Sequence, residues 1–145
     1  MQDRFKFRAW DDKNKIYHYK DFVVTATGFI AKVTSDGEIC QTDMEYDKNL
    51  ILEQCTGLRD KNGKLIYEGD IIKGIHPDDD SCEGYFCFTT EIKYIYSEKD
   101  YKLGFYTDVC FIRGCFENPI MSVVRICDDI EIIGNIHQNP ELLEG

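Results

Sequence analysis

Four of the seven cysteines form two equally spaced pairs, which are the residue types that a metal site needs. Cys82 and Cys87 are separated by four residues, and Cys110 and Cys115 have the same spacing. Four thiolates can hold zinc in a tetrahedral site, and a four-residue spacer is at the upper limit of the usual spacing. On a strand the members of each pair face opposite sides, so zinc binding also needs a bend between them. The alternative is that these cysteines are small buried apolar residues.

A second group of residues with metal-binding types lies in the segment "HPDDDSC". It contains His76, Asp78, Asp79, Asp80 and Cys82. This mixture of hard and soft ligands matches no familiar metal site, so we interpret the segment as an exposed acidic loop. The three aspartates also allow a different hypothesis, in which their carboxylates imitate the phosphates of a nucleic acid.

The segment "TGLRDKNGKLIYEGDII" invites a calcium hypothesis, because Asp60 and Asn62 supply oxygen ligands. An EF-hand loop that starts at Asp60 requires glycine at its sixth position and glutamate at its twelfth. Gly63 stands at the fourth position instead, and Ile71 stands at the twelfth. The spacing therefore excludes this kind of calcium site, and Asn62-Gly63 predicts a hairpin with a type I′ turn.

Glu68 and Asp70 are two carboxylates around a glycine, a pattern that acid–base catalysis can use. Gly69 predicts a bend, and no nucleophile lies nearby, so we interpret this segment as a second turn. The sequence also lacks a phosphate-binding loop, a dinucleotide fingerprint, a nucleophile elbow and a zinc-protease motif. We therefore predict no catalytic residue and no cofactor. The residues that we assign to structural turns are Asp60, Asn62, Gly63, Gly69 and Asp70.

Composition limits the classes of partner. The chain has 145 residues, a net charge of −10 and a pI of about 4.7, which makes direct binding to nucleic acid unfavourable. The first twenty residues are locally basic. No apolar run approaches the roughly 20 residues that span a bilayer, and no signal-like leader opens the chain. We expect a cytoplasmic protein with reduced thiols and no membrane contact.

Alternation of polar and apolar residues dominates the chain and predicts strands. We expect a mainly β fold, barrel-like or a sandwich, with about eight to ten short, mostly antiparallel strands and one or two short helical turns. Residues 1–145 are expected to form a single domain, or two β subdomains at about 1–49 and 50–145. More local expectations are a strand at 4–10 that returns at 16–24, hairpins at 35–38 and 61–64, a strand or short helix at 50–58, a hairpin of 122–127 with 130–136, and a helical turn at 140–144 capped by Asn139.

Three segments together resemble the YopX protein family of bacteriophages and prophages. They are "FKFRAWDDKNKIY" near the start, "TGLRDKNGKLIYEGDII" in the middle and "EIIGNIHQNPELLE" at the end. The resemblance implies a β-rich protein of phage or prophage origin in the cytoplasm of a bacterium or lysogen. It implies no biochemical activity and no catalytic residue.

A partner surface is the remaining candidate site. Arg8, Trp10 and Tyr67 belong to types that dominate binding hot spots, although core packing is the alternative for Trp10 and Tyr67. We predict a non-catalytic module that binds a host protein or assembles with itself, because unpaired strand edges favour association. The alternatives are an acidic nucleic-acid mimic that binds a host DNA-binding protein, and a small cysteine-ligated zinc protein or enzyme.

Overall fold

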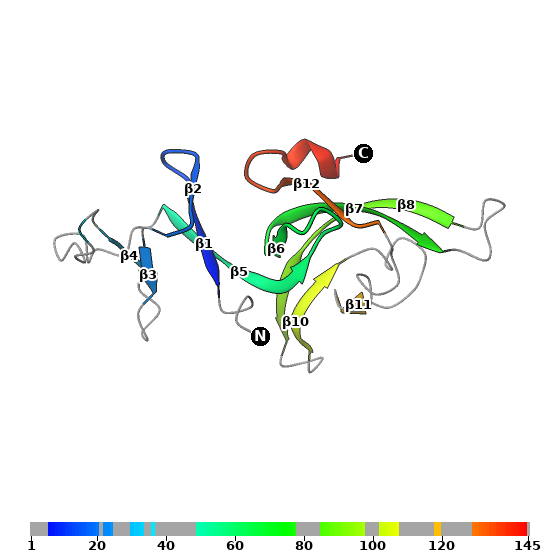
Figure 1. Ribbon diagram of the computed structural model, residues 1–145, viewed down its shortest axis with the longest axis horizontal. Coiled ribbons are helices and arrows are strands. Elements are labelled where there is room, and N and C mark those ends of the chain that lie inside the picture. The colour runs from blue at the N-terminus through cyan, green and yellow to red at the C-terminus, as the bar shows by residue number, and fades with distance from the viewer. Residues whose placement is uncertain are drawn as a thin grey trace. The chain divides into compact units, whose positions relative to one another are not determined.

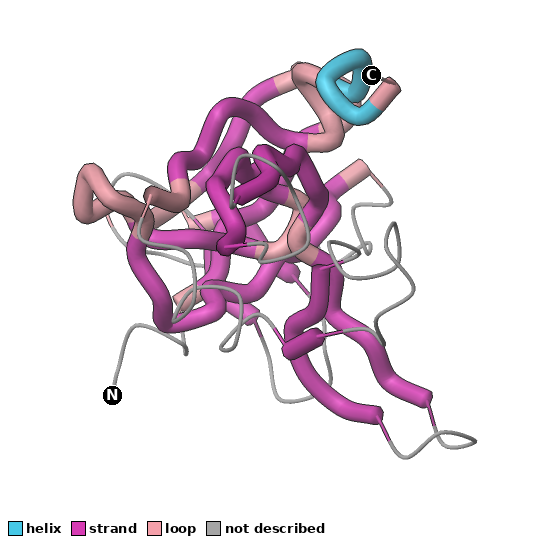
Figure 2. Tube along the Cα trace, turned by 90° about the vertical axis from the view of Figure 1, so that its right-hand side faces the viewer, coloured by secondary structure: helices cyan, strands magenta, loops and turns pink. Residues whose placement is uncertain are grey.

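The computed structural model describes residues 6–20, 22–24, 30–33, 36, 49–77, 85–97, 102–107, 118–119 and 129–144. These residues contain strands and one 3-10 turn (Figures 1 and 2). No helix among them is long and apolar enough to cross a membrane. The elements are β1 (Phe7–Asp11), β2 (Ile16–His18), β3 (Phe22–Val24), β4 (Ile30–Lys32), β5 (Leu50–Arg59), β6 (Leu65–Tyr67), β7 (Asp70–Pro77), β8 (Tyr85–Glu91), β9 (Lys93–Ser97), β10 (Lys102–Thr107), β11 (Asn118–Pro119), β12 (Glu131–Asn135) and η4 (Pro140–Leu143).

The chain divides into two compact units. Unit 2 comprises Lys6–Gln54, and unit 1 comprises residues 1–5 and Cys55–Gly145. Strand β5 passes from one unit into the other, because its first half pairs with β1 and its second half pairs with β6. The number of independently folding domains stays a prediction.

Unit 2 is built from antiparallel strand pairs. Strand β1 pairs with β2 on one side and with the first half of β5 on the other. Strands β3 and β4 form a separate pair. The register places Trp10 opposite both Tyr17 and Ile51, so these three residues share one face of the sheet. The expected return strand at 16–24 is divided into β2 and β3.

Unit 1 holds two three-stranded sheets, with strand orders β12-β7-β8 and β11-β10-β9. The partner of β12 is β7, from which it is separated by more than fifty residues of sequence. Pairing is antiparallel in every described ladder of the chain. Segment 122–127, the expected hairpin partner of 130–136, lies outside the described residues, as does the predicted hairpin at 35–38 apart from Asp36.

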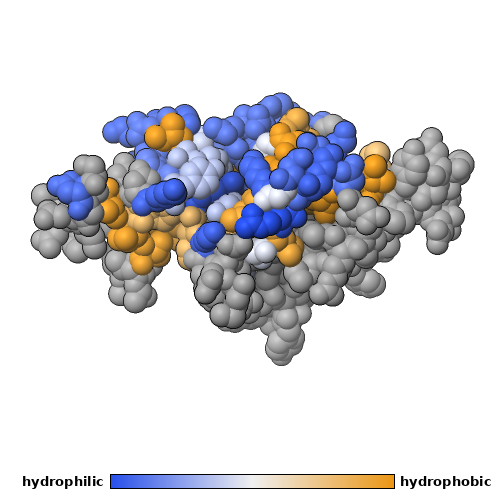
Figure 3. Space-filling view, viewed as in Figure 1, coloured by the Kyte–Doolittle hydropathy of each residue, from blue (hydrophilic) through white to orange (hydrophobic). Residues whose placement is uncertain are grey.

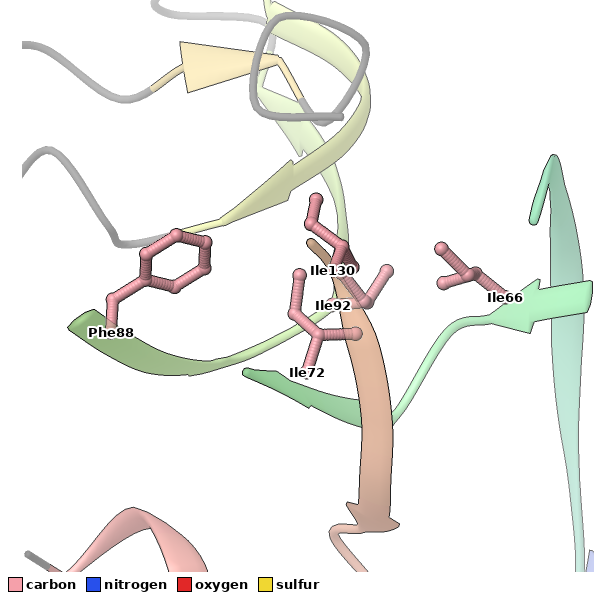
Figure 4. Close-up of a cluster of buried hydrophobic side chains, with 5 residues drawn as sticks. All are labelled: Ile66, Ile72, Phe88, Ile92 and Ile130. Carbon is pink, nitrogen blue, oxygen red and sulfur yellow. The ribbon is translucent and has the colours of Figure 1, made fainter. Parts of the chain in front are cut away.

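The apolar core of unit 1 is drawn from several strands. It consists of Ile66, Ile72, Phe88, Ile92 and Ile130, each at most 6% exposed. Figure 4 shows the side chains of Ile72, Ile92 and Ile130 turned toward one another. Because these residues come from distant parts of the sequence, their burial holds β7, β8 and the segment before β12 together.

The expectation of a mainly β, antiparallel fold with one helical turn is confirmed. Residues 50–58 form a strand, which settles the alternative between strand and helix. Asn139 does stand at the N-cap of η4, but its side chain makes no capping hydrogen bond. The side-chain oxygen of Asn139 instead accepts a hydrogen bond from the Asn135 backbone N–H at 3.4 Å.

The turn at residues 61–64 is not type I′, so that prediction is wrong. A type I′ turn needs positive φ at two successive residues, and of Asn62 and Gly63 only Gly63 has it, at 79°. The Gly63 N–H donates to the Asp60 carbonyl, and the Asp60 N–H donates to the Lys64 carbonyl. This pattern fits the three-residue loop in which a type I turn is followed by a left-handed glycine.

Gly74 is expected to tolerate no side chain. A Cβ atom at this position would lie 2.6 Å from Cζ of Phe88, which is directly opposite on β8. Gly74→Ala should therefore lower the free energy of unfolding by about 1–3 kcal/mol through overpacking. Urea unfolding followed by far-UV circular dichroism, which reports on the strands of both units, measures the loss. Lys73→Ala, at the exposed neighbouring position, is the control, and equal effects of the two substitutions would contradict the packing argument.

Candidate functional site

The most buried charged pair of unit 2 joins β1 to β5. Arg8 and Glu53 are paired across the two strands, and Arg8 Nε donates to Glu53 Oε2 at 2.6 Å. Their side chains are only 4% and 3% exposed. The Tyr17 hydroxyl lies 3.3 Å from the same oxygen, and the Arg8 guanidinium lies 4.4 Å from the centre of the Tyr17 ring. Three strands are thus joined by one polar cluster.

Trp10 lies beside this cluster. Its ring centroid is 5.0 Å from that of Tyr17, with the two planes tilted by 57°. The indole N–H donates to the carboxylate of Asp12 at 3.2 Å, and Trp10 is 1% exposed. Trp10 therefore packs within unit 2, with its one polar atom hydrogen-bonded.

Asp11 organises the turn that follows β1. Its Oδ1 accepts hydrogen bonds from the backbone N–H groups of Lys13 and Asn14, and its Oδ2 accepts one from the Asn14 side chain. His18 Nε2 lies 3.6 Å from the same Oδ2. The carboxylate is 2% exposed, so its oxygens serve the turn rather than an open site.

The Asp60 carboxylate holds a turn of unit 1 as Asp11 does in unit 2, and it also accepts a hydrogen bond from β12. Its Oδ1 accepts hydrogen bonds from the N–H groups of Asn62 and Lys64, and its Oδ2 accepts one from Ile132 on β12. Burial on its own raises the pKa of this carboxyl group. The hydrogen bonds from Lys64, Ile132 and Asn62 outweigh that effect, so the pKa lies below its ordinary value.

Lys61 adds further bonds between the loop at 60–64 and the residues around the start of β12. Its backbone N–H donates to the Ile130 carbonyl at 2.8 Å. Its Nζ lies 3.0 Å from Glu131 and 3.1 Å from Asp129. These two carboxylates raise the pKa of Lys61. The loop at 60–64 is therefore bonded to the chain on both sides of Ile130.

The turn at 67–70 makes a second connection. The Tyr67 N–H donates to Asp70 Oδ2 at 2.8 Å, and Gly69 has a φ of 75°. The Gly69 N–H donates to the Ile92 carbonyl, and its own carbonyl accepts from the Ile136 N–H. Gly69 thus joins the connection between β8 and β9 to the end of β12. Glu68, the other carboxylate that we considered for acid–base chemistry, is half-buried in this turn.

The candidate partner residues are all buried. Arg8, Trp10 and Tyr67 are 3%, 1% and 8% exposed. Arg8 and Trp10 belong to unit 2, and Tyr67 belongs to unit 1. This burial favours the alternative that Trp10 and Tyr67 pack in the core. Arg8 is buried as well. A role for these three side chains in recognition stays a prediction.

The candidate zinc ligands are mostly outside the described residues. Cys87 is described and is exposed on β8, whereas Cys82, Cys110 and Cys115 are not described, and neither are Asp78, Asp79 and Asp80. Among the described residues, no three His, Cys, Asp or Glu side chains are grouped so that they could hold a metal ion. The zinc hypothesis stays a prediction.

Comparison with known proteins identifies the family. The family model described as YopX protein matches residues 6–144. This chain belongs to the YopX protein family. Among solved structures, it is similar to protein EF1440 from Enterococcus faecalis, with 27% identity, a TM-score of 0.54 and coverage of 95% of this chain and 96% of that one. It also resembles the fold of protein yopX from Bacillus subtilis, with 23% identity, a TM-score of 0.58 and coverage of 96% and 98%.

No curated protein matches the chain. The YopX motifs therefore have to be explained by their contacts. The middle segment contains both turns described above, and their partners Ile130, Ile132 and Ile136 lie in or beside the C-terminal segment. The first segment contains β1, which pairs with the start of β5. In this YopX protein, the described hydrogen bonds of Asp60, Lys61 and Gly69 connect distant segments and so maintain the fold.

The Asp60 connection should depend on charge and pH. Asp60→Asn keeps an acceptor for the turn but presents an NH₂ group to the Ile132 N–H, so we expect a loss of about 1–3 kcal/mol at pH 7. A carboxyl group with a lowered folded pKa stabilises the protein above its unfolded pKa, and that contribution disappears as pH falls through the folded pKa. The difference between wild type and variant should therefore shrink below about pH 4.

Urea unfolding at a series of pH values measures this difference. Asp129→Asn is the matched control, because the Asp129 side chain is half exposed and its described contact is an ion pair with Lys61 Nζ at the surface. A difference between wild type and Asp60→Asn that stays constant down to pH 2 would contradict the assigned role of the charge.

The Arg8–Glu53 pair should behave as a unit. Glu53→Leu leaves a buried guanidinium without this carboxylate, and we expect a loss of about 3–5 kcal/mol. Adding Arg8→Met to Glu53→Leu should recover most of that loss, because both charges are then removed. A double-mutant cycle of unfolding free energies tests the coupling. Additive effects of the two substitutions would show that the pair contributes no interaction of its own.

Proposed function

We propose that this YopX protein is a non-catalytic binding protein that acts through contacts with other proteins. The supporting observation is the segment 12–20, which we call the basic hairpin. It includes the turn after β1 and strand β2, and it carries Ile16 and Tyr19 at 49% and 55% exposure. Among the large apolar side chains of the described residues, these two are the most exposed. Exposed apolar residues rimmed by polar ones are typical of interaction sites.

The position of β2 supports the same proposal. Strand order β2-β1-β5-β6 places β2 at the end of its sheet among the described strands. An edge strand is a natural template for a second chain, whether a host protein or another copy. Figure 3 shows apolar atoms at the surface of the same unit near β3, where Val24 is 36% exposed.

The basic hairpin differs in charge from the protein as a whole. The chain has a net charge of −10, yet the basic hairpin presents Lys13, Lys15 and Lys20 at its surface. An overall acidic protein repels phosphate backbones, which favours protein partners over nucleic acid. Phage or prophage origin and a cytoplasmic location are part of the proposal, as the family resemblance suggests.

The alternative functions have less support. An acidic nucleic-acid mimic needs Asp78, Asp79 and Asp80, and a zinc protein needs Cys82, Cys110 and Cys115. Because these residues lie outside the described part of the chain, no observation here favours either function.

A pull-down from a nuclease-treated bacterial lysate tests the proposal. Tagged wild-type protein should retain a stoichiometric protein, either a host protein or an untagged copy of itself. The double substitution Ile16→Ser and Tyr19→Ser should lower retention at least about tenfold, because exposed apolar contacts at a strand edge are lost. Mass spectrometry of the retained fraction provides the measurement.

Ile75→Ser is the matched control, since Ile75 is 39% exposed on β7 in the other unit. Both variants should keep the far-UV circular dichroism and melting temperature of the wild type. Retention that is equal in the two variants, or that disappears with nuclease, would overturn the proposal.

A further inference from the structure

We infer that the partner of the basic hairpin is a second copy of this chain, which binds through its C-terminal turn, residues 141–144. This inference rests on the proposed function and identifies the partner for that same surface. Two patches on one chain have complementary charge and similar apolar content, and each is presented by an ordered element.

The hairpin patch has exposed apolar side chains on both faces of the segment, because Tyr19 lies on the face of Tyr17 and Ile16 lies on the opposite face. Ile16 and Tyr19 are exposed, and Lys13 precedes them while Lys20 follows. The turn is held by the Asp11 carboxylate and by the hydrogen bond from Lys15 N–H to the Asp11 carbonyl at 2.7 Å. An ordered turn loses less conformational entropy on binding than a flexible one.

The C-terminal patch has the opposite charge. Leu142 and Leu143 are 36% and 39% exposed, and Glu141 and Glu144 stand on either side of them at exposed positions. The segment Asn139–Glu144 contains acidic residues in this turn and no basic one. Both segments therefore carry two exposed apolar side chains, and the exposed lysines of one are opposite in charge to the exposed glutamates of the other.

The C-terminal patch is also held in place. The Asn139 N–H donates to the Asn135 carbonyl at 2.9 Å, and the Leu142 N–H donates to the Asn139 carbonyl at 3.1 Å. Gly134 permits this close packing, because a Cβ atom there would lie 2.7 Å from Asn139 Oδ1 and 2.9 Å from Leu142 Cδ1. The turn is thus packed against β12 while its charged residues remain exposed.

Complementary charge selects this occupant. Two copies that both carry −10 repel at most orientations, and the repulsion is relieved where lysines meet carboxylates. The contact is heterologous, since one patch binds a different patch, so copies associate head to tail into a ring or a chain. A contact of a few side chains buries little area, so we expect weak, concentration-dependent association.

Sedimentation velocity from about 1 μM to about 1 mM tests the inference. The wild type should associate as concentration rises. Lys13→Glu with Lys20→Glu, and separately Glu141→Lys with Glu144→Lys, should each shift the association at least about tenfold toward monomer, because like charges then face each other. A single chain that carries all four substitutions should associate again, since both patches have exchanged sign.

Lys64→Glu is the control for a charge change elsewhere, because Lys64 is exposed outside both patches. Wild type that stays monomeric over the whole range, association that ignores either charge reversal, or a fourfold variant that stays monomeric would overturn the inference. A monomeric protein that still retains a host protein through Ile16 and Tyr19 would leave the proposed function standing and assign the hairpin to that partner.

Discussion

Unit 1 depends most on the hydrogen bonds that the Asp60 carboxylate accepts. This carboxylate lies in a local turn, yet one of its oxygens accepts a hydrogen bond from Ile132, seventy-two residues later in the sequence. Closing a loop of that length costs conformational entropy, and contacts between its two ends must offset that cost. The neighbouring bond from Lys61 to the Ile130 carbonyl and the bond from Ile136 to Gly69 close the same loop twice more. Together they set β12 beside β7, and the isoleucine core can then form.

Much of this architecture could be predicted from local patterns. Alternation of polar and apolar residues placed β1, the strand character of β8 and the position of β12, because period-two burial is encoded residue by residue. Asp60, Gly63 and Gly69 were expected at turns, since their backbone and side-chain chemistry acts over a few residues. The type I′ prediction failed because Asn-Gly is compatible with more than one turn, and the Asp60 side chain favours the alternative.

Pairing between distant strands could not be predicted in the same way. Glu53 lies in the apolar run "LILEQC", which was a signal for a buried charge, but its partner Arg8 depends on the β1–β5 register. Gly57, with a φ of 82°, marks an irregularity in β5 that the sequence analysis did not assign. A glycine inside a strand is the available signal for such a bulge. Residue type alone also does not distinguish a hot spot from a buried core residue, so it could not indicate that Arg8, Trp10 and Tyr67 are buried.

Buried and exposed charges have different tasks in this protein. A slip of one residue between β1 and β5 would place Arg8 opposite Leu52 or Gln54 and separate the two buried charges, so the Arg8–Glu53 pair favours the observed register. Asp11, Asp60 and Asp70 are likewise occupied with backbone N–H groups. The side chains of Lys13 and Lys20 on the hairpin and of Glu141 and Glu144 in the C-terminal turn take no part in these contacts. These exposed charges contribute little to the stability of the fold, so they are available for recognition by another chain.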